Sequence, residues 1–183
     1  MRLKLQHAGY LSRKITKDLI NCDFVEIRKD KNAIAAQIQD MLEEDIDKEL
    51  ALDEKVSDIL DNQEESIEFY NADYRQLFWM TKKRLSNEYH VILNNEDRFK
   101  NISHTVSGYL WDEDFIHFTV SENLVNNVIY NAIEEFMHGF EEADEIVYEK
   151  IKHYKRKIIP GTEEYDLIYQ RLYEEELIRK GLI

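Results

Sequence analysis

The chain repeats its own pattern after 91 residues, and this repeat limits the fold more than any other feature of the sequence. Without a gap, the shift aligns identical residues along the whole length, including Ser12 with Ser103, Leu19 with Leu110, Phe24 with Phe115, Asn32 with Asn123, Ile38 with Ile129, Val56 with Val147 and Tyr74 with Tyr165. Self-similarity at a fixed period is typical of a repeated structural unit. We therefore predict an internal duplication, with a diverged N-terminal repeat at residues 1–91 and a C-terminal repeat at residues 92–183. The sequence leaves open whether the two repeats pack as one domain or two.

Both halves show helical periodicity and contain few residues that interrupt helices. The 183 residues include only five glycines and one proline, whereas sheet-rich folds need turn residues at regular intervals. Apolar residues recur at four-residue steps, as at Leu11, Ile15 and Leu19, which indicates one face of a helix. Side chains suited to capping predict helix starts at Asp30, Asp53, Ser121, Asp144 and Thr162. We predict an all-α helical bundle with three or four helices in each repeat.

Two short segments of different character interrupt the helical pattern. Residues 24–27 and 115–118 are rich in aromatic and β-branched side chains, which favour extended structure. The two segments are equivalent under the repeat. We predict that they pair as a small two-stranded ribbon joining the halves, provided that other side chains pack behind it.

Charge and cysteine content narrow the class of protein. The chain has 24 Lys and Arg against 38 Asp and Glu, for a net charge of −14, which is the opposite of the balance in proteins that coat nucleic acid. Cys22 is the only cysteine, so an intramolecular disulfide and a cysteine-based zinc cluster are excluded. The N-terminal residues lack the apolar region of a signal peptide, and no run of about 18 apolar residues is present to span a membrane. We expect a cytoplasmic protein that does not associate with membranes.

The one dense basic run lies near the C-terminus. It consists of Lys150, Lys152, His153, Lys155, Arg156 and Lys157, with Tyr148 and Tyr154 interleaved and Thr162 in the turn that follows. Basic and aromatic side chains together can bind phosphates and stack on unpaired bases. The plainer interpretation is a helix C-terminus, where cations oppose the helix dipole and pair with nearby glutamates. A solvated helix end, an RNA- or anion-binding site and a protein-docking site all stay open.

Long acidic stretches suggest a second kind of surface. Asn101–Glu149 contains no Lys or Arg, and residues 40–68 are similarly acidic. Such surfaces can dock basic proteins or mimic nucleic acid, and the plainer interpretation is a solvated face that keeps the protein soluble.

Motifs for chemistry are weak. Glu135 and His138 have the Glu-x-x-His spacing of di-iron helical bundles, but the matching first-half positions are Glu44 and Asp47, and a surface histidine is the plainer interpretation. No nucleophile elbow, glycine-rich phosphate loop or Cys/His constellation is present. We expect no cofactor and lean against an enzyme.

The last forty residues resemble the signature of the bacterial domain-of-unknown-function family 507, in a tandem-duplicated form. The resemblance is carried by Asp144, Glu145, Val147, Lys150, Ile151, Arg156, Gly161, Thr162, Glu164, Tyr165, Tyr173, Glu174 and Glu175. Two positions depart from the family pattern, because Tyr165 replaces the usual Trp and Pro160 the usual acidic residue. The resemblance implies a helical bacterial cytoplasmic protein and no particular activity.

Together these features predict a non-enzymatic cytoplasmic binding or adapter protein whose partner is another protein. The alternative is an RNA- or anion-binding protein that uses the basic run at residues 150–157. A metal-binding helical bundle is the third hypothesis.

Overall fold

The computed structural model describes residues 2–63, 67, 73–154 and 158–182, which form six helices and one ribbon of two strands. The helices are α1 (Leu5–Ile20), α2 (Lys31–Asp61), α4 (Tyr74–Leu85), α5 (Asn95–Asp112), α6 (Glu122–Lys152) and α7 (Glu163–Arg179). The strands are β1 (Glu26–Ile27) and β2 (Ile116–His117). The all-α prediction is confirmed. Among the described helices, none has the length and apolar character needed to cross a membrane.

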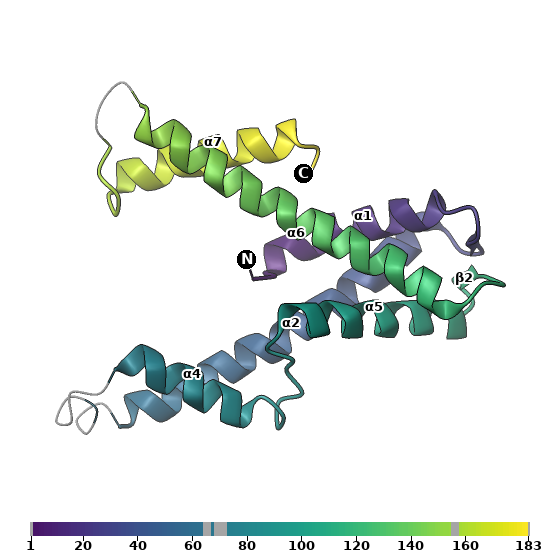
Figure 1. Ribbon diagram of the computed structural model, residues 1–183, viewed down its shortest axis with the longest axis horizontal. Helices are drawn as coiled ribbons and strands as arrows, with labels where there is room; N and C mark the ends of the chain where they lie inside the picture. The colour runs from purple at the N-terminus through teal and green to yellow at the C-terminus, as the bar shows by residue number, and fades with distance from the viewer. Residues whose placement is uncertain (1, 64–66, 68–72, 155–157, 183) are drawn as a thin grey trace.

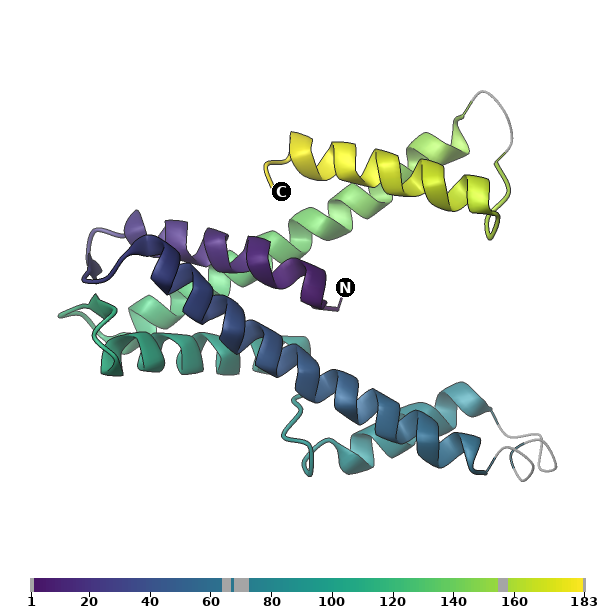
Figure 2. The ribbon, with the colours of Figure 1, turned by 180° about the vertical axis from the view of Figure 1, so that it is seen from behind.

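The two longest helices, α2 and α6, form the frame of the molecule (Figure 1). Helix α4 folds back on the C-terminal part of α2, and α7 folds back on the C-terminal part of α6, so that two helical hairpins project from the centre. Helix α1 packs between α2 and α6, and α5 also contacts both (Figure 2). The hairpins diverge, and each therefore has its own small core.

Buried apolar side chains form three clusters that follow this plan. The central cluster joins the two halves of the chain, with Leu11, Leu42, Leu110 and Phe136 among its members. A second cluster lies between α2 and α4, and a third between α6 and α7. Burial of apolar surface is the main favourable contribution to folding, so the central cluster holds the halves together while each hairpin depends on its own contacts.

The predicted ribbon is confirmed. Strands β1 and β2 are antiparallel, and Glu26 pairs with His117 while Ile27 pairs with Ile116. The packing that such a short ribbon requires comes from α5, because the Trp111 ring stacks on the His117 ring with centroids 4.8 Å apart.

The prediction of separate helices beginning at Asp53 and Asp144 is wrong. Both aspartates lie inside continuous helices of 31 residues. The apolar face continues in register past each aspartate, and no proline interrupts either helix, so nothing ends the hydrogen-bond ladder there. The predicted cap Asp30 is confirmed, since its carboxylate accepts from the Asn32 N–H at 2.8 Å. Thr162 caps α7, whereas Ser121 holds the cap position of α6 without a side-chain hydrogen bond.

The helices follow the 91-residue spacing closely. Helices α2 and α6 have equal lengths and begin at Lys31 and Glu122, which are 91 positions apart. Helices α5 and α7 begin within two residues of the positions that the same shift gives from α1 and α4. The spacing is thus a property of the structure, while a common origin of the halves and their division at residue 91 stay predictions.

Candidate functional site: a cleft between α1 and α7

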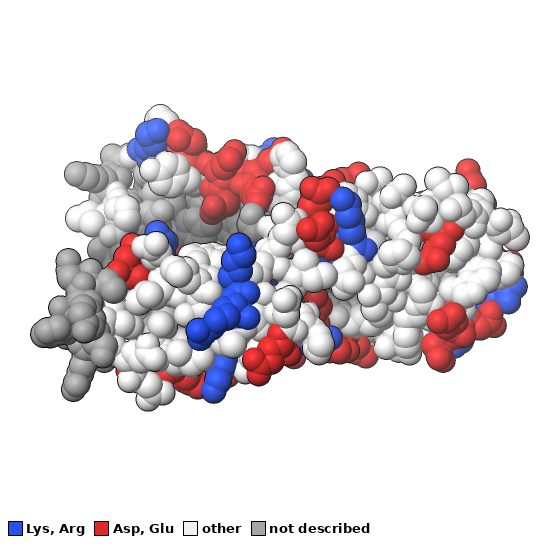
Figure 3. Space-filling model, turned by 60° about the horizontal axis from the view of Figure 1, so that its bottom comes forward, with Lys and Arg blue, Asp and Glu red and all other residues white. Residues whose placement is uncertain are grey.

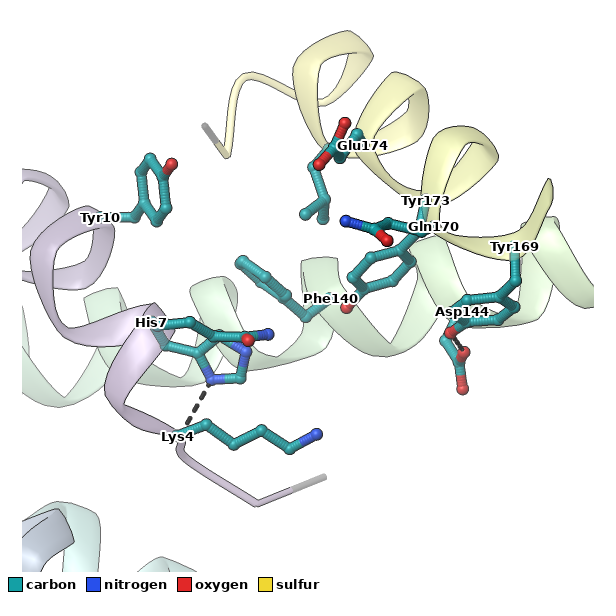
Figure 4. A pocket seen from close by; sticks show the side chains of 11 residues that line it. Lys4, His7, Tyr10, Phe140, Asp144, Tyr169, Gln170, Tyr173 and Glu174 are labelled. Carbon is teal, nitrogen blue, oxygen red and sulfur yellow. Dashed lines mark hydrogen bonds between the residues drawn. The ribbon is translucent and has the colours of Figure 1, made fainter. Parts of the chain in front are cut away.

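A cleft of about 560 Å³ opens between the start of α1 and the inner face of α7, with α6 as its floor (Figure 4). Its lining includes Lys4, Gln6, His7 and Tyr10 at α1, Phe140 and Asp144 of α6, and Tyr169, Gln170, Tyr173 and Glu174 of α7. This volume lies in the usual range of ligand pockets, which combine apolar walls with a few polar groups. The cleft is therefore a candidate ligand site.

His7 is the least satisfied polar side chain of the cleft. Its ring is buried, with 1% of its surface exposed, and its Nδ1 accepts the backbone N–H of Lys4 at 3.1 Å. The proton of the neutral ring is therefore on Nε2, and this buried N–H has no hydrogen-bond partner among the described residues. Burial and the nearby charge of Lys4 lower the pKa of His7 to about 4. At neutral pH the ring is thus an uncharged donor that lacks an acceptor, which costs free energy.

The α7 wall of the cleft is a ladder of tyrosines. Tyr169 and Tyr173 line the cleft, and their rings stack with centroids 5.6 Å apart. Tyr165 continues the row four residues earlier on α7, outside the cleft. Tyr173 also reaches the floor, where its ring meets Phe140 edge-on at 6.3 Å. The result is an aromatic surface that runs along one side of the cleft and continues beneath it.

Asp144 brings a carboxylate to the edge of this aromatic surface. The Tyr169 hydroxyl donates a hydrogen bond to it (Figure 4). Burial and this hydrogen bond raise the pKa of Tyr169, and burial together with the charge of Asp144 raises the pKa of Tyr173 to about 12. Both hydroxyls therefore stay protonated at neutral pH.

The corresponding place in the first half of the chain is closed by ion pairs. Glu49 of α2 is buried, and its carboxylate accepts from Lys82 of α4 at 2.8 Å and from Arg98 of α5. Lys82 also contacts Asp53 at 2.7 Å, and Arg2 reaches Glu49 at 3.0 Å and Asp53 at 2.7 Å. Burial favours a higher pKa for Glu49, but the hydrogen bond from Lys82 and the charge of Arg98 outweigh it and hold that pKa below its usual range.

Four residues of this ion-pair centre match four residues of the cleft at the 91-residue spacing. The pairs are Glu49 with Phe140, Asp53 with Asp144, Lys82 with Tyr173 and Arg98 with His7. The contacts match as well, because Arg98 touches Glu49 and His7 packs on Phe140 with ring centroids 4.6 Å apart. One fold position therefore holds a closed charged cluster in one half and an open aromatic cleft in the other.

Sequence reasoning did not find either of these two places. Glu49 belongs to the acidic stretch at residues 40–68. It nevertheless lies on the buried face of α2, between Ile46 and Leu52. A single glutamate within an apolar stripe is a signal that could have identified the ion-pair centre. For the cleft, the signal is the repeat itself. Under the 91-residue shift His7 aligns with Arg98, so a histidine stands where the other half has an arginine.

The basic run is used mainly for local contacts where the structure describes it. Lys150 donates to the buried Glu176 of α7, Lys152 contacts Glu149 at 3.2 Å, and His153 lies against the last turn of α6. The Tyr154 hydroxyl accepts from Arg171 at 3.2 Å. Lys155, Arg156 and Lys157 lie outside the described residues. RNA or anion binding by the run stays a prediction.

Thr162 also has a structural task. Its hydroxyl donates to the Ile159 carbonyl at 2.8 Å and accepts the Tyr165 N–H at 3.3 Å. These bonds satisfy polar backbone groups at the start of α7.

The weak metal candidates lie on the surface of α6. Glu135 pairs with Lys14 at 2.9 Å, and His138 contacts Glu142 at 3.3 Å. Within the described ranges, no group of three or more His, Cys, Asp or Glu side chains is arranged to hold a metal ion. On the face shown in Figure 3, acidic side chains form several separate groups among uncharged surface and basic side chains.

A comparison with protein families finds one match across the chain. The model described as a protein of unknown function (DUF507) matches residues 1–182. The match covers both halves, so the family resemblance is confirmed and extends well beyond the last forty residues. No curated protein matches the chain.

Proposed function

This chain belongs to the DUF507 family, described as proteins of unknown function, and we propose from its cleft that it is a non-enzymatic cytoplasmic binding or adapter protein. The cleft between α1 and α7 holds the ligand, which is part of another protein. One observation carries the proposal: the buried His7 Nε2–H at the wall of the cleft has no acceptor among the described residues. A bound ligand supplies that acceptor and removes the cost of the unmade hydrogen bond.

The ion-pair centre supports this proposal by contrast. At the matching place in the first half, the donor Arg98 has its carboxylate partners Asp45 and Glu49. The fold can therefore satisfy a side chain at this position from within the chain, and the second half does not. An open place in one of two equivalent centres is what a binding site in that half requires.

The protonation states of the cleft favour binding over acid–base catalysis. A general acid or base works best with a pKa near the working pH. The pKa of His7 is about 4 and that of Tyr173 about 12, so both groups keep one protonation state around neutrality. They act as fixed hydrogen-bonding groups.

Site-specific photo-crosslinking in cells tests the proposal. A benzophenone amino acid replaces the exposed Gln170 in the cleft, and the same residue replaces the exposed Leu124 near the start of α6 as the control. We expect discrete adducts from position 170 that disappear when a Gln6→Trp substitution narrows the cleft. The absence of adducts at position 170, or the same adducts from position 124, would contradict the proposal.

A further inference from the structure

We propose that the occupant of the cleft is a basic peptide segment of a partner protein, which places an arginine guanidinium against the Asp144 carboxylate. This inference depends on the proposed function, since it identifies the ligand of the same cleft. It rests on the comparison of two matching places in one chain, on the charge of the cleft, and on the aromatic surface beside Asp144.

The chain itself shows how a guanidinium occupies the equivalent place. Arg2 belongs to the extended segment before α1, and its guanidinium bridges two side chains of α2, with Nε 3.0 Å from Glu49 and Nη1 2.7 Å from Asp53. Glu49 and Asp53 match Phe140 and Asp144 of α6. A guanidinium placed in the same way in the second half would pair with Asp144 and lie against the Phe140 ring.

No guanidinium of the described chain fills that place. The residue that matches Arg2 is Leu93, and it packs instead with the cluster between α2 and α4. The polar contact described for the Asp144 carboxylate is the hydroxyl of Tyr169. A carboxylate has about four acceptor positions on its two oxygens, so Asp144 can accept a guanidinium while it keeps Tyr169.

The walls of the cleft have the chemistry that recognises arginine. The flat guanidinium stacks on aromatic rings and pairs with carboxylates in one plane. Asp144 lies beside the stacked rings of Tyr169 and Tyr173, and Glu174 adds a second carboxylate. The cleft thus has two carboxylates against one ammonium, that of Lys4, and the whole chain carries a net charge of −14. This balance attracts a cationic ligand and opposes phosphate or nucleic acid.

His7 adds a reason for a peptide rather than an isolated cation. Its Nε2–H needs an acceptor, and a guanidinium has none. A peptide backbone carries a carbonyl at every residue. A segment that places its arginine on Asp144 can therefore offer a neighbouring carbonyl to His7 across the floor of the cleft.

Titration by NMR tests the inference directly. The probes are three nine-residue peptides of alanine and serine that differ only at the central position, which is arginine, lysine or citrulline. Each is titrated into isotope-labelled full-length protein, and the signals of the cleft residues and of the His7 Nε2 proton are followed. We expect the arginine peptide to bind at least about tenfold more tightly than the citrulline peptide, because citrulline is neutral. We expect the lysine peptide to be intermediate.

Matched variants separate cleft binding from general attraction to an acidic protein. Asp144→Asn should weaken the arginine peptide about tenfold, and Asp112→Asn, which removes the same charge at an exposed site at the end of α5, should leave its affinity unchanged. Equal binding of the arginine and lysine peptides, or equal effects of the two variants, would overturn the inference.

The outcomes also separate this inference from the proposed function. If none of the peptides binds but the benzophenone at position 170 still forms adducts in cells, the cleft has a ligand of another class and the arginine assignment fails alone. If neither the peptides nor the crosslinker report an occupant, the proposed function fails with it.

Discussion

Glu49 and Phe140 lie 91 positions apart on helices of the same length, and each occupies the buried face of its helix where a hairpin leaves the centre. Glu49 binds Lys82 and Arg98, whereas Phe140 packs on Tyr173 and His7. The two contacts connect the same pairs of elements, α2 to α4 and α5 in one half and α6 to α7 and α1 in the other. A charged joint and an aromatic joint therefore perform the same structural task within one molecule.

Loss of the Glu49 carboxylate should destabilise the protein strongly. Glu49→Gln leaves the buried cations Lys82 and Arg98 with fewer negative charges nearby, and breaking a buried pair from one side costs about 3–5 kcal/mol. Urea unfolding measures the change in the free energy of unfolding. Glu44→Gln serves as the control, since Glu44 forms an exposed pair with Lys48 on the same helix, and such pairs contribute about 0–1 kcal/mol. Equal losses of unfolding free energy in both variants would show that the buried ion pairs of Glu49 contribute no more to stability than the exposed pair of Glu44.

His7 should make stability fall between pH 6.5 and 4.5. Its pKa is about 4 in the folded protein against an ordinary value of 6.5, so the unfolded chain binds the extra proton first. The stabilisation is complete above pH 6.5 and is lost as the pH falls toward 4. One proton changes the free energy of unfolding by about 1.4 kcal/mol per pH unit at most.

The same pH series on a His7→Gln variant provides the test. The stabilising carboxylate Glu49 titrates below its ordinary value of 4.5, so the window above pH 4.5 reports the histidine. Across this pH window, the free energy of unfolding of the variant should fall by roughly 2–3 kcal/mol less than that of the native protein. Parallel curves would mean that His7 titrates normally in the folded state.

Two neighbouring lysines of the basic run should respond differently to charge reversal. Lys150→Glu places a negative charge against Glu176, whose side chain is 3% exposed, and we expect the thermal midpoint to fall by about 4 °C or more. Lys152 pairs only with the exposed Glu149 among the described residues, so Lys152→Glu should change the midpoint by less than about 2 °C.

Nucleic acid that copurifies with the protein and is lost in a Lys152→Glu/Arg156→Glu variant would favour the RNA alternative, because that variant leaves Lys150 intact.

Replacing Gly139 by alanine should raise the free energy of unfolding less than replacing Gly108 by alanine. Both glycines lie inside helices, where alanine is favoured by about 1 kcal/mol. A Cβ at position 108 meets nothing within 4 Å, whereas one at position 139 comes within 2.9 Å of the Leu182 side chain. We expect calorimetry to show gains of about 1 kcal/mol for Gly108→Ala and about half as much for Gly139→Ala. In a Leu182→Ala background the two gains in unfolding free energy should become equal. A persistent difference would show that the cost of the added methyl group at position 139 does not come from Leu182.

Much of the fold follows from local sequence patterns. The four-residue apolar steps predict the helices, and the residues around Phe24 and Phe115 predict the ribbon, because both signals arise from neighbours along the chain. The failure at Asp53 and Asp144 has a physical cause. An aspartate predicts a cap only if the helix needs one, and here the apolar face continues through it, so its carboxylate turns to a partner on another helix.

The candidate site could not be predicted in the same way. The cleft depends on how far α7 stands from α1, and α1 is placed by packing on α6 between residues more than 100 positions apart. The charges of the basic run are adjacent in the sequence, so the sequence alone predicts the run as a candidate site. In the structure Lys150 instead supports the joint between α6 and α7 through Glu176. Binding by the basic run stays a prediction, and Lys155, Arg156 and Lys157 lie outside the described residues.

The matching residues Glu26 and His117 pair directly with each other in the antiparallel ribbon. This pairing is consistent with an approximate twofold rotation that relates the two long helices. A dimer of identical halves would have to place the same side chains at both joints, so any change that opened one cleft would open two. A continuous chain is free of this constraint. It can keep one joint closed by ion pairs and leave the other open, and the closed joint can compensate for the stability that the open joint gives up.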